Sequence, residues 1–430
     1  MKYVIVLGDG MADRPIEELD NKTSLEYAKT PYMDALAQKG ELGMVHTIPE
    51  GMKPGSDTAN LSVLGYDPKK YYSGRSPLEA LSIGVPMKDT DVALRCNLVT
   101  LSEEQDCYED RYMIDHSSDE ISTEDAAVLL AAVRDAFENK WFQFYVGTSY
   151  RHCLIWNQGS IVELDQPHDI LGQCIREHLP ANLGIDCKVG PKGWGVKDSN
   201  PLYYMMKKSY DILVNHPINV ARREKGLKPA NSCWFWGAGT KPALSSFEEK
   251  TGKKGAMISA VDLLKGIAVG ASMQVIEVPG ANGGLHTNYE GKAQAAIDAL
   301  TKDGNDFVYV HLEGPDEMGH QGSIERKIQA IEWLDEKIVK PISEGLSEAG
   351  EDYRMLILPD HPTPICIRTH SSEPVPYILY DSTQGGVIDV EESQDVPAGD
   401  SILRYNEKDA AKTGVYVAEG HTIIDKLLLD

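Results

Sequence analysis

The chain has 430 residues, of which 42% are hydrophobic and 25% are charged, and 42 lysine and arginine residues stand against 66 aspartate and glutamate residues. This composition is typical of a globular protein with a sizeable core, and the length predicts two or three domains. The formal net charge of −24 excludes a protein that binds nucleic acid or an anionic membrane surface through general electrostatic attraction.

The first apolar run, Tyr3–Leu7, predicts a buried parallel strand, and Asp9 follows it. Gly8 and Asp9 interrupt the run too early for the core of a signal peptide. No stretch approaches the ~18 apolar residues of a membrane span. The seven cysteines show no C-x-x-C spacing, which indicates reduced thiols rather than disulfides or a thiolate metal site. We therefore expect a cytoplasmic protein.

The next motif, Pro54–Leu61, predicts the start of a helix that runs through Leu64, with Ser56 in its first turn. Backbone amides at a helix N-terminus attract phosphate, so a hydroxyl at this position is well placed to attack phosphorus. A metal bound to that hydroxyl would lower its pKa. Ser56 is therefore either a simple N-cap or a nucleophile, and a metal site nearby would favour the nucleophile.

The middle of the chain, from about residue 89 to about residue 228, differs in character from the rest. It contains polar helical segments such as Thr123–Asn139 and short strands such as Phe142–Val146, and residues 215–231 have the composition of a returning linker. We therefore predict that residues 89–228 form an inserted α+β domain that binds substrate or acts as a lid. The main domain is then discontinuous and consists of residues 1–88 and 229–430.

Two further apolar runs near the C-terminus, Phe307–Val310 and Met355–Leu358, predict strands. Ile328, Ile331, Leu334 and Ile338 between them recur at helical spacing, as a crossover helix requires. Strands alternating with helices predict an α/β fold with a mainly parallel sheet flanked by helices. Such sheets bind ligands beyond the carboxyl ends of their strands.

Aspartate and histidine residues follow each of the three predicted strands. Asp316 and His320 are spaced for one face of a helical turn, whereas the adjacent side chains of Asp360 and His361 diverge unless two metals lie on either side. Each residue alone could be a capping aspartate or a hydrogen-bonded histidine, but together they predict one metal site. Aspartate and histidine without cysteine suit Mn²⁺, Zn²⁺ or Fe²⁺. The predicted ligands are Asp9, Asp316, His320, Asp360, His361 and His370.

Nucleotide-binding motifs are absent from the sequence. Gly8, Asp9 and Gly10 begin a glycine-rich turn that lacks the third glycine of a dinucleotide fingerprint, and no G-x-x-x-x-G-K-[ST] motif occurs. We therefore expect no nucleotide cofactor.

The predicted ligands and Ser56 resemble the metal set of the alkaline phosphatase superfamily. More closely, the chain is similar nearly end to end to the archaeal-type branch of the cofactor-independent phosphoglycerate mutases. The stretches that carry this resemblance are Gly8–Asp13, Pro54–Pro68, Gly74–Ala80, Tyr150–His152, Trp234–Gly239, Ser259–Leu264, His311–His320 and Asp360–Pro376. Two departures concern the substrate: Pro362 follows His361 where better-known members have glycine, and the insert is shorter and less basic.

The resemblance implies an alkaline-phosphatase-like fold and a glycolytic and gluconeogenic isomerase that uses two divalent metals, usually manganese with zinc as an alternative, and no bisphosphoglycerate. Ser56 would become phosphorylated, and Lys250 would neutralise charge beside it. One metal would be held by Asp9, Ser56, Asp360 and His361, and the other by Asp316, His320 and His370. Candidates for gripping a small phosphorylated hydroxy acid are Arg151, His152, Arg222, Arg223 and Lys241.

Two alternatives stay open from the sequence, and the oligomeric state is not determined. The same metals and serine could serve a phosphatase or another phosphotransferase, such as an enzyme that phosphorylates homoserine. The chain could also be a metal-binding scaffold without activity, although the complete ligand set argues against this. The acidic net charge does not exclude a phosphate ester, because three aspartate ligands contribute −3 where two divalent metals add +4.

Overall fold

The computed structural model describes residues 1–180, 200–385 and 403–429. Its contacts divide the chain into unit 1, Met1–Tyr72 with Ala243–Asp430, and unit 2, Ser73–Pro242. The boundaries expected at 88/89 and 228/229 both fall inside unit 2. The reason is packing: helix α5 (Arg75–Ser82) contacts strands of unit 2, and β7 (Ser232–Thr240) is itself a strand of that unit's sheet.

Unit 1 is built on an eight-stranded sheet in the order β13-β2-β12-β11-β1-β10-β8-β9. All pairs are parallel except those that β12 makes with β11 and β2. The predicted mainly parallel α/β architecture is therefore confirmed. The strands are β1 (Lys2–Gly8), β2 (Glu41–Val45), β8 (Gly255–Ile258), β9 (Gln274–Val275), β10 (Phe307–Leu312), β11 (Tyr353–Leu358), β12 (Val375–Asp381) and β13 (Tyr416–Val417).

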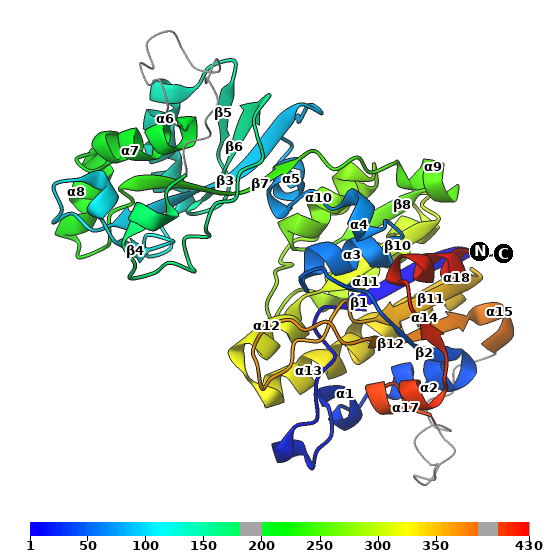
Figure 1. Cartoon of the computed structure of the whole chain (residues 1–430). Helices are drawn as coiled ribbons and strands as arrows, with labels where there is room; N and C mark the ends of the chain where they lie inside the picture. The colour runs from blue at the N-terminus through cyan, green and yellow to red at the C-terminus, as the bar shows by residue number, and fades with distance from the viewer. Residues whose placement is uncertain (181–199, 386–402, 430) are drawn as a thin grey trace. The chain divides into compact units, whose positions relative to one another are not determined.

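Both faces of this sheet are buried, which explains why its strands read as continuous apolar runs. Val4 and Val6 of β1 belong to one core with α2, α11, α13 and α14, whereas Ile5 and Leu7 are buried on the other face. Helices cover both faces (Figure 1). The helices of unit 1 are α1 (Ser24–Tyr27), α2 (Pro31–Lys39), α3 (Ser56–Val63), α4 (Pro68–Tyr71), α9 (Phe247–Thr251), α10 (Asp262–Gly270), α11 (Tyr289–Thr301), α12 (Gly314–Gln321), α13 (Ile324–Leu334), α14 (Lys340–Glu348), α15 (Ser382–Gly385), α17 (Glu407–Lys412), α18 (Ile423–Leu428) and the short turns Glu17–Leu19 and Gly420–Thr422.

The crossover between β10 and β11 is longer than the apolar spacing predicted. Helix α13 continues through a π-helical turn, Asp335–Val339, into α14. Ile331, Leu334 and Ile338 are buried as expected, but Ile328 is only half-buried and the fully buried neighbour is Lys327. Lys327 lies four residues before Ile331 and so shares its helix face, which means that a charged residue occupies a core-facing position.

Unit 2 has an antiparallel sheet in which β3 pairs with β4, β6 and β7, and β6 pairs with β5. Its other strands are β3 (Asp91–Leu101), β4 (Met113–Asp115), β5 (Phe142–Tyr145) and β6 (Arg151–Asn157). Its other helices are α6 (Thr123–Phe137), α7 (Pro201–Leu213), α8 (Pro217–Glu224) and the turns Tyr108–Asp110 and Ile175–His178. Helices α6 and α7 pack with the sheet in a separate core.

The segment expected to be a linker, residues 215–231, contains helix α8. His216 caps this helix by accepting a hydrogen bond from the amide of Ile218 at 3.3 Å. Pro217 fixes the first helical φ. Both residues are local signals of a helix start, but the polar composition of the whole segment favoured a linker.

Two expectations from composition can be compared with the structure. Across the described ranges, no helix is long and apolar enough to cross a membrane. The cysteines with free thiols are Cys96, Cys107, Cys153, Cys174, Cys233 and Cys366, and Cys187 lies outside the described residues.

Candidate active site and metal centre

The site of unit 1 is formed where β1 ends between its two parallel neighbours. Leu7 of β1 pairs with His311 of β10 on one side and with Leu358 of β11 on the other. Parallel strands in this register end at the same sheet edge, so the loops that follow them meet. Asp9 and Asp360 therefore emerge side by side, and α12 starts directly after β10.

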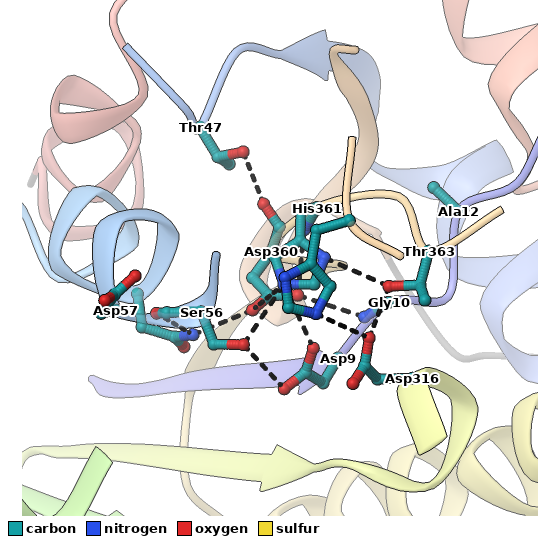
Figure 2. A network of polar contacts seen from close by, with 12 residues as sticks. Asp9, Gly10, Ala12, Thr47, Ser56, Asp57, Asp316, Asp360, His361 and Thr363 are labelled. Carbon is teal, nitrogen blue, oxygen red and sulfur yellow. Dashed lines mark hydrogen bonds and ion pairs between the residues drawn. The ribbon is translucent and has the colours of Figure 1, made fainter. Parts of the chain in front are cut away.

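The first group of possible ligands consists of Asp9, Asp360 and His361, all buried. Each offers one ligand atom, and the three atoms lie within 4.8 Å of one another. Ser56 joins this group from the first turn of α3, as Figure 2 shows: its Oγ lies 3.2 Å from His361 Nε2 and 3.4 Å from Asp9 Oδ2. The predicted helix start thus places the serine hydroxyl beside the first group.

The second group consists of Asp316, His361 and His370, again with ligand atoms within 4.8 Å. His320 borders this group, with its Nε2 at 3.2 Å from Asp316 Oδ2 and at 3.0 Å from His370 Nε2. All six predicted ligands and Ser56 are therefore brought together. One feature of the ligand groups was not predicted from the sequence: His361 belongs to both of them.

Several supporting residues were not predicted as part of the site. Asn60, one turn after Ser56, donates to Asp360 Oδ2 at 3.0 Å and to the Ser56 carbonyl at 2.8 Å. His311 Nε2 lies 3.0 Å from Asp9 Oδ2. The spacing Ser56-x-x-x-Asn60 on one helix face and the position of His311 at a strand end are signals that could have indicated both residues.

Thr363 is a third supporting residue, and it joins the two groups. Its hydroxyl donates to Asp316 Oδ1 and lies 3.3 Å from His361 Nδ1. Figure 2 shows Thr363 beside Gly10, with dashed lines from its hydroxyl to Asp316 and His361. The sequence offered no signal for this role, because Thr363 lies between two prolines in a loop.

Charge is unevenly distributed over the site. Burial, together with the carboxylates of Asp360 and Asp316, raises the pKa of Asp9 well above its usual value, and burial lowers the pKa of His361. Burial also raises the pKa of Asp316, but hydrogen bonds from His320 and His370 outweigh it and hold that pKa well below its usual value. The first group thus brings crowded carboxylates together, and no described lysine or arginine forms an ion pair with them.

The donor set fits divalent metal ions. Asp9 Oδ1 is buried and has no hydrogen-bond partner within the described part of the chain, and a buried carboxylate oxygen in that state is costly unless a cation satisfies it. Oxygen and imidazole nitrogen donors without sulfur suit Mn²⁺ and Zn²⁺. The two groups, which share His361, are the candidate positions for such ions.

Lys250 is not brought beside Ser56. Its Nζ lies 5.6 Å from the centre of the Tyr66 ring, beyond the C-terminal end of α3, whereas Ser56 begins that helix. Eight residues at 1.5 Å each separate the two ends by about 12 Å. Phe247, which is fully buried, anchors α9, the helix that carries Lys250.

The five basic candidates lie in unit 2, and the four cationic ones fall into two kinds. Arg151 and Lys241 are exposed; the Arg151 guanidinium lies over the Tyr150 ring at 5.1 Å, and Lys241 is 3.6 Å from Asp89. Arg222 is buried and donates to the carbonyls of Lys228 and Ser118. Arg223 pairs with Glu103.

His152 differs from the four cationic candidates. It is buried, which lowers its pKa to about 4, so its imidazole is neutral at pH 7. Its Nδ1 accepts from the amide of Gly147 at 3.2 Å. Its Nε2 has no hydrogen-bond partner among the residues that the structure describes.

Comparison with known proteins shows which family this chain resembles. The model of the 2,3-bisphosphoglycerate-independent phosphoglycerate mutase family matches residues 37–219. The chain is 45% identical over 430 residues to the 2,3-bisphosphoglycerate-independent phosphoglycerate mutase of Methanosarcina barkeri, covering 100% of this chain and 99% of that protein. It is 43% identical over 430 residues to the protein of the same name from Methanosarcina mazei, covering 100% of both.

Solved structures agree with this similarity over the whole chain. A protein from Pyrococcus horikoshii has a TM-score of 0.76 and 30% identity, covering 99% of this chain and 96% of that one. The cofactor-independent phosphoglycerate mutase from Thermoplasma acidophilum has a TM-score of 0.63 and 24% identity, covering 100% and 99%. The second comparison establishes a shared fold.

Proposed function

The chain belongs to the family of 2,3-bisphosphoglycerate-independent phosphoglycerate mutases, and from this premise we propose that it interconverts 2- and 3-phosphoglycerate through a phosphoserine at Ser56. The enzyme is then an isomerase that acts on a small phosphorylated acid. The observation that carries the proposal is the position of Ser56 Oγ, 3.2 Å from His361 Nε2 and 3.4 Å from Asp9 Oδ2. A hydroxyl at this point faces the residues best suited to hold metal.

Two metal ions complete the proposed site. We assign one to Asp9, Asp360, His361 and Ser56, and the other to Asp316, His320 and His370. When bound, these ions supply positive charge for the phosphoryl oxygens and lower the pKa of the Ser56 hydroxyl. We propose manganese as the metal, which the oxygen and imidazole donors and the family resemblance support.

The residues of the chain then act on the substrate in two balanced transfers. In the first, a bond forms between Ser56 Oγ and phosphorus while the bond from phosphorus to the glycerate oxygen breaks. Ser56 loses its hydroxyl proton, which Asp9 Oδ2 accepts in a hydrogen bond. The departing glycerate oxygen gains a proton, so the number of protons is unchanged. In the second transfer the other glycerate hydroxyl takes the phosphoryl group, and Ser56 regains its proton.

The surroundings of Ser56 support this nucleophilic role. Asn60 holds the Ser56 carbonyl and Asp360 together, which fixes the first turn of α3 against the first group. The N-terminus of α3 also favours negative charge at the position that the phosphoryl group would occupy. Positioning of this kind is the main contribution a protein makes to phosphoryl transfer.

Substrate contacts outside the metal groups are part of the proposal. We favour Arg151 and Lys241, because both side chains are exposed and neither donates to a backbone carbonyl within the described ranges. Arg222 and Arg223 are engaged within unit 2. We assign Lys250 no role in the reaction. A cytoplasmic role in glycolysis and gluconeogenesis is proposed from the family resemblance.

An enolase-coupled assay tests the proposal. Protein loaded with Mn²⁺ is expected to convert 3-phosphoglycerate without bisphosphoglycerate, and Ser56→Ala is expected to lose at least 10³-fold in turnover, as removal of a nucleophile does. Ser62→Ala on the same helix is the matched control, because Ser62 is buried and its hydroxyl has no hydrogen-bond partner among the residues that the structure describes. Release of inorganic phosphate in place of 2-phosphoglycerate, or undiminished turnover of Ser56→Ala, would contradict the proposal.

A further inference from the structure

Lys327 of α13 is a fully buried lysine whose three ammonium protons all have acceptors. Its side chain is 0% exposed. Its Nζ donates to Thr363 O at 2.8 Å, to Asp13 Oδ2 at 2.9 Å and to Ala12 O at 3.2 Å. An ammonium group withdrawn from water at high cost persists only where such acceptors are fixed around it.

The three acceptors belong to the two loops that carry the first ligand group. Ala12 and Asp13 lie in the loop that leaves β1 after Asp9, and Thr363 lies two residues after His361 in the loop that leaves β11. The Ala12 carbonyl also accepts from the Thr363 amide at 3.2 Å. Lys327 therefore binds the two loops at the point where they already touch. Figure 2 shows one of the bound residues, Thr363, beside Gly10 and Asp316.

Neutralising Asp13 does not by itself account for this arrangement. Asp13 Oδ1 already accepts from the amides of Arg14 and Ile365, and Oδ2 accepts from Ser24. Two of the three bonds from Lys327 go instead to backbone carbonyls, one on each loop. An ion pair alone would leave these two bonds unexplained.

The contact at Thr363 extends the influence of Lys327 to the second group. While the Thr363 carbonyl accepts from Lys327, its hydroxyl donates to Asp316 and approaches His361 Nδ1. The space is tight, because a side-chain carbon at Gly319 would stand 2.7 Å from the same Thr363 carbonyl. A displacement of Thr363 is therefore transmitted to ligands of both groups.

We propose that Lys327 is a positioning residue that holds the loops after β1 and β11 so that Asp9, His361 and Asp316 present their donor atoms to two metal ions in one fixed relation. This inference rests on the proposed function only in taking these residues as metal ligands. Lys327 itself touches neither metal nor substrate, so its effect is on metal binding first and on turnover second.

The test measures Mn²⁺ binding to protein freed of metal by dialysis against a chelator. Wild-type protein is expected to bind two Mn²⁺ per chain in calorimetric titration and to show the electron paramagnetic resonance spectrum of an exchange-coupled pair. Lys327→Met, which keeps the length of the side chain without its donors, is expected to bind at least one Mn²⁺ about 10- to 100-fold more weakly, as loss of a residue behind the ligands does. The exchange-coupled spectrum should be lost as well.

The matched control separates positioning from stability. Arg354 and Asp381 form an ion pair at 2.8 Å at the opposite end of β11, with side chains 16% and 15% exposed. Arg354→Met is expected to lower the melting temperature while leaving Mn²⁺ affinity and the spectrum unchanged. Weakened Mn²⁺ binding in Arg354→Met to the same degree would overturn the inference.

A second variant keeps the inference testable if Lys327→Met does not fold. Lys327→Arg retains charge and donors in a planar rather than tetrahedral arrangement, and an intermediate loss of Mn²⁺ affinity, at least about threefold, is expected. Wild-type affinity and spectrum in the folded Lys327 variants would overturn this inference alone. Wild-type protein that binds no Mn²⁺ would overturn the proposed function and this inference with it.

Discussion

The imidazole rings of His361 and His370 lie 4.1 Å apart between centroids, with their planes tilted by 35°. His361 belongs to both ligand groups, whereas His370 belongs to the second group alone. The two histidines thus differ in how many of the ligand groups lose a donor when each is replaced.

This difference predicts unequal metal contents. His370→Ala is expected to retain about one divalent ion per chain after dialysis, and His361→Ala to retain less than one, because His361 belongs to the first group as well as the second. Elemental analysis of the dialysed proteins measures both contents, with wild type as the reference of two. Equal losses in the two variants would contradict a shared role for His361.

Asn60 is expected to matter for activity although it is no ligand. Asn60→Ala removes the donor to Asp360 Oδ2 and to the Ser56 carbonyl, so we expect kcat/KM to fall about 10- to 100-fold. Steady-state kinetics with saturating Mn²⁺ measures the effect. Ser62→Ala, a substitution at a buried position of the same helix, should change kcat/KM less than about threefold; an equal loss there would point to general damage to α3.

Gly10 is required by close contact as well as by its φ of +62°. A side-chain carbon at Gly10 would stand 2.6 Å from Thr363 Oγ1 and 2.7 Å from Asp316 Oδ1. Gly51 also has a positive φ, of +84°, but a side-chain carbon there would meet no described atom within 4 Å. Gly51→Ala therefore measures the cost of a side chain at a positive φ without a steric clash. We expect Gly10→Ala to lower the melting temperature by about 5 °C more than Gly51→Ala. Mn²⁺ affinity should also weaken in Gly10→Ala alone, and equal effects of the two substitutions would remove the contact argument.

The carboxyl group of Glu407 predicts a pH-dependent stability. It accepts hydrogen bonds from the Thr23 hydroxyl and the Asp13 amide, and burial raises its pKa to about 7. The folded state therefore holds this proton more tightly than the unfolded state. The stabilisation is complete below about pH 4.5 and is lost as pH rises through about 7, by about 3 kcal/mol in total.

Melting temperatures of wild type and Glu407→Gln measure this effect. Gln does not titrate and can accept from the Asp13 amide as the protonated carboxyl does. As pH rises from 5 to 8, the melting temperature of Glu407→Gln is expected to rise relative to that of wild type. A difference between the two proteins that stays constant over this range would show that Glu407 does not titrate in it.

Lys250 is expected to contribute little to turnover. Because it lies against Tyr66 beyond the far end of α3, Lys250→Ala should change kcat/KM less than about tenfold, compared with at least 10³-fold for Ser56→Ala. The same coupled assay compares the two variants. A loss as large as that of Ser56→Ala would restore the role that the sequence suggested for Lys250.

The main features of the fold follow from the sequence because they depend on local signals. Tyr3–Leu7, Phe307–Val310 and Met355–Leu358 are continuous apolar runs, and only a strand buried on both faces requires such a run. Parallel strands end at one edge, so an aspartate that follows such a run is expected at that edge. The predicted ligands were therefore placed together without any knowledge of strand order.

The unit boundaries and several side-chain roles could not be obtained in this way. Helix α5 and strand β7 have ordinary local patterns, and only their mutual packing assigns them to unit 2. From its neighbours in the sequence, Arg222 is expected to be an exposed cation. It is instead buried, and its guanidinium donates to the carbonyl of Ser118, more than 100 residues away. Such partners are selected by the path of the chain rather than by neighbouring residues.

The sequence by itself determined the α/β class, three strands of the main sheet and the aspartates, histidines and serine of the site, because apolar periodicity and residue chemistry are properties of short segments. Only the tertiary structure decided that His361 borders both ligand groups, that Thr363 joins them and that Lys327 is buried behind them. Those relations bring Lys327 to Ala12 across 315 residues and Thr363 to Asp316 across 47. Contacts over such separations exist only once the loops after β1, β10 and β11 have met at one edge of the folded sheet.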